Sequence, residues 1–163
     1  MFVCPILEYA VASWDPHTES GKNRLERVQR KAIRIVYQNF DRDKFSTDNL
    51  LLERKWMSLE DRRKIIRLTT LHKCKTGYPG LQELQEHLKN PNYLSARVDH
   101  KYKIKEIPAV KNQYKHSFLP RTIKDWNALP EKLFVHDKSD NLVETTVFRN
   151  RLRTHFQAQC DVK

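Results

Sequence analysis

The segment 117–130 (SFLPRTIKDWNALP) constrains the fold more than any other part of the chain, because prolines bracket a short helical pattern. Pro120 can occupy the first position of a helix, where its missing N–H costs nothing. Ile123 and Trp126 then lie on one helix face at i, i+3 spacing. The residue before Pro130 disfavours the α conformation, so the helix should end there. The segment predicts a short helix anchored by Ile123 and Trp126.

The rest of the chain also favours helices, since only three of its 163 residues are glycine. Apolar residues recur at helical spacing over 22–39, 59–75, 81–88 and 142–159, and a short helix is expected over 46–55. Ser58 and Asp61 are spaced like the capping box of a helix N-terminus. Residues after Pro130, through Lys138-Ser139-Asp140, are expected to form a loop.

Residues 93–118 lack helical periodicity and predict short strands or an extended arm. The predicted fold class is therefore mainly α, a small helical domain of about five to six helices with a basic arm around 93–118. A first part, 1–90, would hold most helices. A second part, 91–163, would hold the arm, the proline-bracketed helix and the final helix, and the two parts are expected to form one compact unit.

The helix expected over 22–39 carries two stripes. Its apolar stripe, expected to face the core, consists of Leu25, Val28, Ala32, Ile35 and Val36. Its basic stripe, at i, i+3, i+7 and i+10, consists of Arg24, Arg27, Lys31 and Arg34. The segment 22–37 holds six basic residues and one acid, whereas a solvated helix normally mixes charges of both signs. This pattern favours an anionic partner, and a solvated face without a ligand is the alternative.

The arm is basic as well, with eight Lys and Arg against two acids over 97–124. Tyr93, Tyr102 and Tyr114 lie within it or beside it. Aromatic rings among cations suit single-stranded nucleic acid, because bases stack on the rings. The alternative, left open by the sequence, is that these tyrosines pack the arm onto the helices.

The net charge of +11 also favours polyanionic partners. Three widely spaced cysteines argue against a disulfide framework and for reduced thiols inside the cell. No stretch of about 18 apolar residues is present, and the first residues make a poor signal peptide. We therefore expect an intracellular protein of the nucleus or cytoplasm that is neither secreted nor bound to a membrane.

The segment 117–130 resembles Ser-Phe-Phe-Pro-Arg-Thr-Ile-x-x-Trp-Asn-x-Leu-Pro, found downstream of the polymerase domain in non-LTR (LINE-type, jockey-like) retrotransposon reverse transcriptases. Four further segments resemble the same family in the same order, so that the resemblance spans about 3–156: Leu7-Glu8-Tyr9-Ala10, Trp14-Asp15-Pro16, Leu25-Glu26-x-Val28-Gln29-Arg30-x-Ala32-x-Arg34, and Trp56-x-Ser58-Leu59-Glu60-x-Arg62-Arg63. The resemblance implies that this chain corresponds to the region that follows the palm of such a polymerase, and that residues 1–90 form a thumb-like part.

A thumb grips the template–primer duplex by its backbone, which requires basic helices and no sequence readout. The resemblance thus implies a partner that is an RNA/DNA hybrid or duplex backbone, together with an upstream polymerase palm, and no small-molecule substrate. The residues expected to contact nucleic acid are Arg24, Arg27, Lys31, Arg34, Arg62, Arg63, Lys101, Lys103 and Arg121. The expected structural anchors are Trp14, Trp56, Phe118 and Trp126. Arg121 could meet either a phosphate or a carboxylate such as that of Asp125 or Glu131.

Catalysis is not expected. A reverse transcriptase needs paired aspartates to hold two Mg²⁺ ions, and the sequence has no Asp-Asp pair. Asp41-Arg42-Asp43 comes nearest and predicts a charged loop. His72-Lys73-Cys74 lacks the paired, closely spaced ligands of a zinc site, so neither metal nor cofactor is predicted. The alternative function is a structural remnant that docks on a polymerase palm or self-associates without affinity for nucleic acid.

Overall fold

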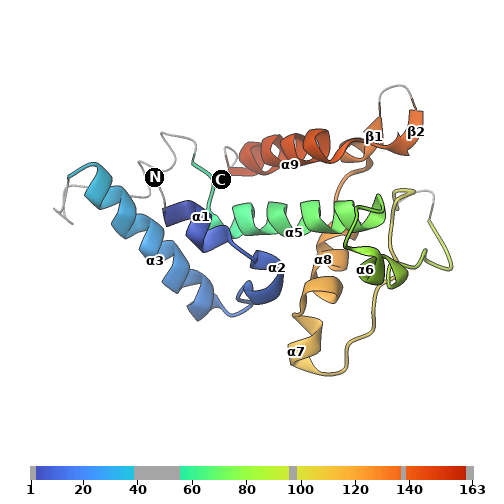
Figure 1. Cartoon of the computed structure of the whole chain (residues 1–163), viewed down its shortest axis with the longest axis horizontal. Coiled ribbons are helices and arrows are strands. Elements are labelled where there is room, and N and C mark those ends of the chain that lie inside the picture. The colour runs from blue at the N-terminus through green and yellow to red at the C-terminus, as the bar shows by residue number, and fades with distance from the viewer. Residues whose placement is uncertain (1–2, 39–55, 96–98, 137–138, 161–163) are drawn as a thin grey trace. The chain divides into compact units, whose positions relative to one another are not determined.

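The computed structural model describes residues 3–38, 56–95, 99–136 and 139–160 (Figure 1). The chain is mainly α, which confirms the predicted fold class. Along the described residues the elements are α1 (Val3–Glu8), α2 (Val11–Trp14), α3 (Glu19–Val36), α5 (Leu59–Lys75), α6 (Gln82–Glu86), α7 (Asn112–Lys115), α8 (Phe118–Asn127), a 3₁₀ turn (Glu131–Leu133), β1 (Val135–His136), β2 (Ser139–Leu142) and α9 (Thr145–Cys160). The helix expected over 46–55 and the Asp41-Arg42-Asp43 loop lie outside the described residues.

Contacts divide the chain into two units, 1–64 with 155–163, and 65–154. This division differs from the boundary expected at residue 90. Residues 65–90 belong with 91–154, and the end of α9 belongs with the N-terminal segments. Among the helices of the described residues, none is long and apolar enough to cross a membrane.

In the first unit, local caps fix the ends of the helices. The Thr18 hydroxyl accepts a hydrogen bond from the Gly21 N–H at 3.3 Å and begins α3. The Ser58 hydroxyl accepts from the Asp61 N–H at 3.0 Å and donates to the Asp61 carboxylate at 2.7 Å. The Ser58 cap predicted from the sequence is therefore present at the start of α5, with the Asp61 carboxylate bonded to the Ser58 hydroxyl in place of the backbone N–H of a full capping box.

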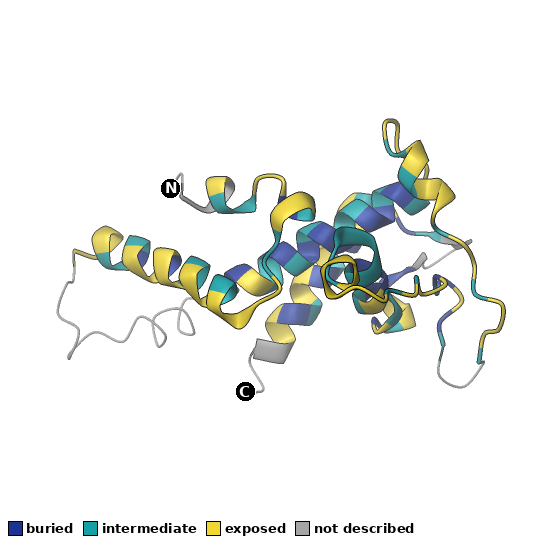
Figure 2. Ribbon diagram, turned by 90° about the horizontal axis from the view of Figure 1, so that it is seen from below, coloured by how far each residue is buried: buried dark blue, intermediate teal, exposed yellow. Residues whose placement is uncertain are grey.

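The buried face of α3 differs from the predicted apolar stripe. Gln29 and Ile33 are buried, whereas Val28, Ile35 and Val36 are 41%, 64% and 57% exposed. The physical reason is that tertiary neighbours select the buried face, and α3 packs against α1. Apolar side chains consequently remain on the surface of this helix, most of which is exposed or intermediate in burial (Figure 2).

In the second unit, an aromatic cluster forms the core. The ring centroids of Trp126 and Phe134 lie 4.6 Å apart, and those of His72 and Phe148 lie 4.5 Å apart. Ile123 and Trp126 are fully buried, so α8 is anchored as the sequence predicted. The helix begins earlier than expected, so that Pro120 is its third residue; this position is still in the first turn, where the N–H has no helical partner.

The arm runs through 99–111 with neither helix nor strand, and α8 holds it. Trp126 Nε1 donates to the Tyr102 carbonyl at 2.9 Å. The side chain of Asn127 accepts from the Ile104 N–H at 2.9 Å and donates to the Ile104 carbonyl at 2.8 Å. These bonds satisfy the backbone of a segment that has no strand partner.

The short strands lie elsewhere. β1 and β2 form an antiparallel pair with Val135 opposite Leu142, in the region after Pro130 where a loop was expected. So short a pair carries too few alternating residues to be recognised from the sequence.

Candidate nucleic-acid interface

The basic stripe of α3 lies opposite the buried face of that helix. Arg27 and Lys31 stand two positions before and after buried Gln29, and each residue turns the helix by about 100°, so both lie about 160° away from it. Arg24, Arg27 and Lys31 are all exposed. None of the three forms a hydrogen bond or ion pair with another residue in the described part of the chain.

Arg34 continues the stripe but is only half-exposed. Its Nε is shielded from solvent and meets no hydrogen-bond acceptor within the residues described. The exposed part of the stripe, from Arg24 to Lys31, rises about 10 Å along the helix. That length corresponds to about three phosphates of one nucleic-acid strand, at about 3.4 Å per charge.

Among the described residues of the first unit, the acids nearest α3 in the fold have partners other than this stripe. The Glu26 carboxylate, the one acid of segment 22–37, accepts a hydrogen bond from the Glu60 N–H at 3.0 Å, and burial raises its pKa. Lys22 forms ion pairs with Glu60 at 2.7 Å and Glu19 at 2.9 Å, and hydrogen bonds to these carboxylates raise the pKa of Lys22. These acids therefore bind groups in the first turns of α3 and α5, and within the described part of the chain they leave the charges of the outer face of α3 unpaired.

One predicted contact residue, Arg63, is structural instead, which corrects the sequence analysis, and its neighbour Arg62 is held in an ion pair. The Arg63 side chain is fully buried, and its Nε donates to Asp15 Oδ1 at 2.9 Å. Arg62 forms an ion pair with Glu8 at 2.5 Å, and its side chain is 34% exposed. Arg63 cannot reach a phosphate in this structure, and Arg62 is already neutralised. The carboxylate partners lie more than 45 positions away, so no local pattern in the sequence indicates the pairing.

The remaining predicted contacts belong to the second unit. Lys101 is exposed, with its ammonium 5.2 Å from the centre of the Tyr102 ring. Lys103 pairs with Asp99 at 2.5 Å, and Arg121 is half-buried. Asp125, one acceptor considered for Arg121, forms an ion pair with Arg67 at 3.0 Å.

Arg67 itself is nearly buried and was not singled out from the sequence. It lies in α5 with its guanidinium 3.4 Å from the Thr122 hydroxyl of α8. The charge of this arginine therefore serves the contact between two helices of the second unit.

The predicted anchors are of two kinds. Trp126 is fully buried and Phe118 is half-buried. Trp14 and Trp56 are each 39% exposed, and Trp14 Nε1 donates to the Tyr9 carbonyl. The tryptophans of the first unit thus keep part of their rings at the surface.

The structure separates the three tyrosines for which the sequence left two roles open. Tyr102 is buried against Phe134, with ring centroids 5.6 Å apart, and packs the arm. Tyr93 and Tyr114 are 80% and 48% exposed, so their rings remain accessible to a ligand.

Metal ligands do not gather in the part of the chain that the structure describes: no group of three or more His, Cys, Asp or Glu residues there could hold an ion. His72 and Cys74 are both buried, and Cys74 is a free thiol. The His72 ring stacks on Phe148, and its Nδ1 lies 3.1 Å from the Thr145 hydroxyl. Burial lowers the pKa of His72 to about 4, so this imidazole is neutral at pH 7.

Comparisons of the chain with protein-family models, curated proteins and solved structures found no match.

Proposed function

We propose that this chain is a non-catalytic, nucleic-acid-binding accessory fragment of a retrotransposon reverse transcriptase, and that the outer face of α3 grips the template–primer backbone. One observation carries the proposal: Arg24, Arg27 and Lys31 are exposed on a single helix face, without an ion pair among the described residues. Cations held in this way suit phosphate contacts, which position a duplex without reading its bases. The proposed partners are an RNA/DNA hybrid or duplex and an upstream polymerase palm, in the nucleus or cytoplasm.

The distribution of charge supports this proposal. A surface helix that serves only solubility normally gains stability from pairs of opposite charge at i, i+4. On α3 the only acid of segment 22–37, Glu26, bonds to the backbone of α5 and leaves the stripe unneutralised. The overall charge of +11 adds a long-range attraction for polyanions.

A fluorescence-anisotropy titration with a labelled RNA/DNA hybrid tests the proposal. Arg27→Glu combined with Lys31→Glu should weaken binding about tenfold or more, because two phosphate contacts become repulsive. The matched control is Arg149→Glu combined with Arg153→Glu, two exposed arginines of α9 with the same i, i+4 spacing and the same change of charge. Equal losses in the two variants would mean that only net charge matters and that α3 is not the interface.

The alternative function, a module that docks on a palm or self-associates, is favoured by a different observation. Val28, Ile35 and Val36 expose apolar side chains along one edge of α3. Such a surface gains free energy when a partner covers it. Under this alternative, light scattering would show association of the purified chain at micromolar concentration, and Ile35→Asp would restore the monomer. A wild-type chain that stays monomeric would rule out self-association.

A further inference from the structure

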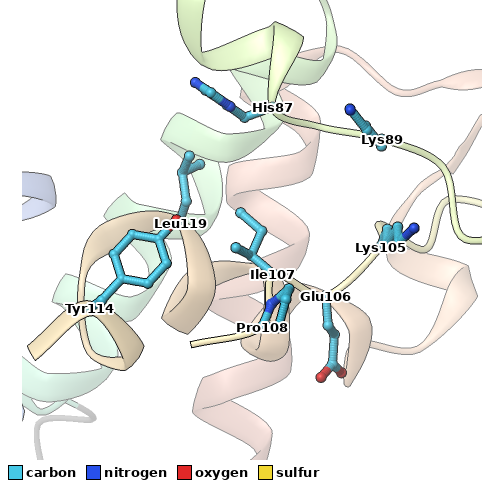
Figure 3. A pocket seen from close by; sticks show the side chains of 8 residues that line it. All are labelled: His87, Lys89, Lys105, Glu106, Ile107, Pro108, Tyr114 and Leu119. Carbon is cyan, nitrogen blue, oxygen red and sulfur yellow. The ribbon is translucent and has the colours of Figure 1, made fainter. Parts of the chain in front are cut away.

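A cavity of about 430 Å³ opens on the second unit, between the end of α6, the arm and α8 (Figure 3). One wall is apolar and consists of Ile107, Pro108, Tyr114 and Leu119. A second, cationic side is formed by Lys89 and Lys105, and His87 also lines the cavity. The volume lies within the range of small-ligand sites, about 300–1,000 Å³, and excludes a duplex.

Backbone contacts hold the cationic side in place. The Lys105 N–H donates to the Lys89 carbonyl at 2.9 Å, which ties the arm to the segment after α6. Lys105 Nζ lies 3.3 Å from the Asn92 amide oxygen, and Lys89 has no side-chain partner among the residues described. Glu106 also lines the cavity, but its carboxylate points away from His87 and Lys89 (Figure 3). The site therefore combines one aromatic ring and an apolar wall with the positive charges of two lysines.

We propose that this cavity takes one unstacked nucleotide of a single-stranded nucleic acid. The base would lie against the Tyr114 ring, which is 48% exposed, because bases stack on aromatic faces without regard to sequence. The phosphate would lie beside Lys89 and Lys105, which offer point charges for it. Most of the lining residues are exposed, so the strand can continue out of the cavity on either side of the bound nucleotide.

This site goes beyond the proposed function, because it belongs to the second unit and uses no residue of α3. The α3 stripe holds a duplex by its backbone, whereas this cavity holds a base. The two proposals can therefore fail independently. Arg27→Glu combined with Lys31→Glu should leave nucleotide binding unchanged, and Tyr114→Ala should leave binding of a hybrid duplex unchanged.

Isothermal titration of the full chain with adenosine monophosphate, adenosine and inorganic phosphate tests the inference. The nucleotide should bind more tightly than either of its parts, since both sides of the cavity then contribute. Tyr114→Ala should weaken binding of the nucleotide about tenfold, the equivalent of about 1.4 kcal/mol, while Tyr114→Phe should retain it. Lys89→Ala should weaken binding of the nucleotide and of phosphate but not that of adenosine.

Lys124→Ala is the matched control, because Lys124 is an exposed lysine of the same unit outside the cavity. Circular dichroism of each variant establishes that it is folded. No heat of binding with millimolar adenosine monophosphate would overturn the inference. The inference would also be overturned if the nucleotide and phosphate bound with equal affinity and Tyr114→Ala changed neither affinity. This result would indicate a cationic surface alone.

Discussion

Arg63 Nε donates to Asp15 Oδ1 at 2.9 Å, and the two side chains are only 0% and 6% exposed. Forty-eight positions separate these residues in the sequence. A buried charge is stable only when it is paired and hydrogen-bonded. The packing of the first unit therefore explains why these two charged residues are present, and no ligand is needed to explain them.

Loss of the Asp15 charge should destabilise the chain. Asp15→Asn removes the hydrogen-bonded counter-charge of the buried Arg63 guanidinium, a loss that costs about 3–5 kcal/mol in comparable pairs. Urea unfolding followed by circular dichroism measures the loss. Glu19→Gln is the control, because Glu19 is 79% exposed in its pair with Lys22 and should contribute far less. Equal stability of the two variants would contradict the buried pair.

Asn127 should be necessary for the placement of the arm. Asn127→Ala removes both side-chain bonds to the Ile104 backbone and leaves a partly buried N–H and carbonyl unpaired, at a cost of about 1–3 kcal/mol. We expect faster hydrogen exchange at the Ile104 amide together with a lower free energy of unfolding. Asn150→Ala, at an exposed position of α9, should change neither quantity. An Ile104 amide that stays equally protected would show that Asn127 does not hold the arm.

Stability should fall in mild acid because His72 is buried in its neutral form. The pKa of His72 is about 4 in the folded chain, whereas the ordinary value of 6.5 applies to the unfolded chain. The unfolded chain therefore binds the proton first as the pH falls. The stability that neutral His72 contributes is fully present above about pH 6.5 and decreases as the pH falls to about 4. Between pH 7 and pH 5 the loss is about 2 kcal/mol. Burial lowers the pKa of His100 as well, so this residue acts in the same direction.

His72→Gln separates the contribution of His72 from that of the other groups. Urea unfolding at pH 7 and pH 5 should show a smaller acid-induced loss in this variant than in the wild-type chain. If both chains lose the same free energy between these pH values, His72 is not the group responsible.

Features with local causes could be predicted from the sequence, and features that depend on distant partners could not. Ile123, Trp126 and the Ser58 cap follow from spacing over a few residues, and the structure confirms them. The buried face of α3 could not be derived, because six apolar residues are spread around this helix and only the packed neighbours decide between them.

The candidate sites show the same distinction. The sequence singled out the α3 stripe, because its i, i+3, i+7, i+10 spacing lies within one helix. It misassigned Arg63, whose partner is distant. It also missed the cavity beside Tyr114, because that site is assembled from four separate segments of the second unit.

The salt dependence of binding to an RNA/DNA hybrid tests the central claim most directly. Each phosphate contact contributes a slope of about −0.9 to log K against log salt, so four to six contacts predict a slope of about −4 to −5. The variant Arg24→Gln/Arg27→Gln/Lys31→Gln should reduce the magnitude of that slope by about 3. A slope that the variant leaves unchanged, or wild-type binding that does not depend on salt, would contradict the assignment of α3 as the phosphate-gripping surface.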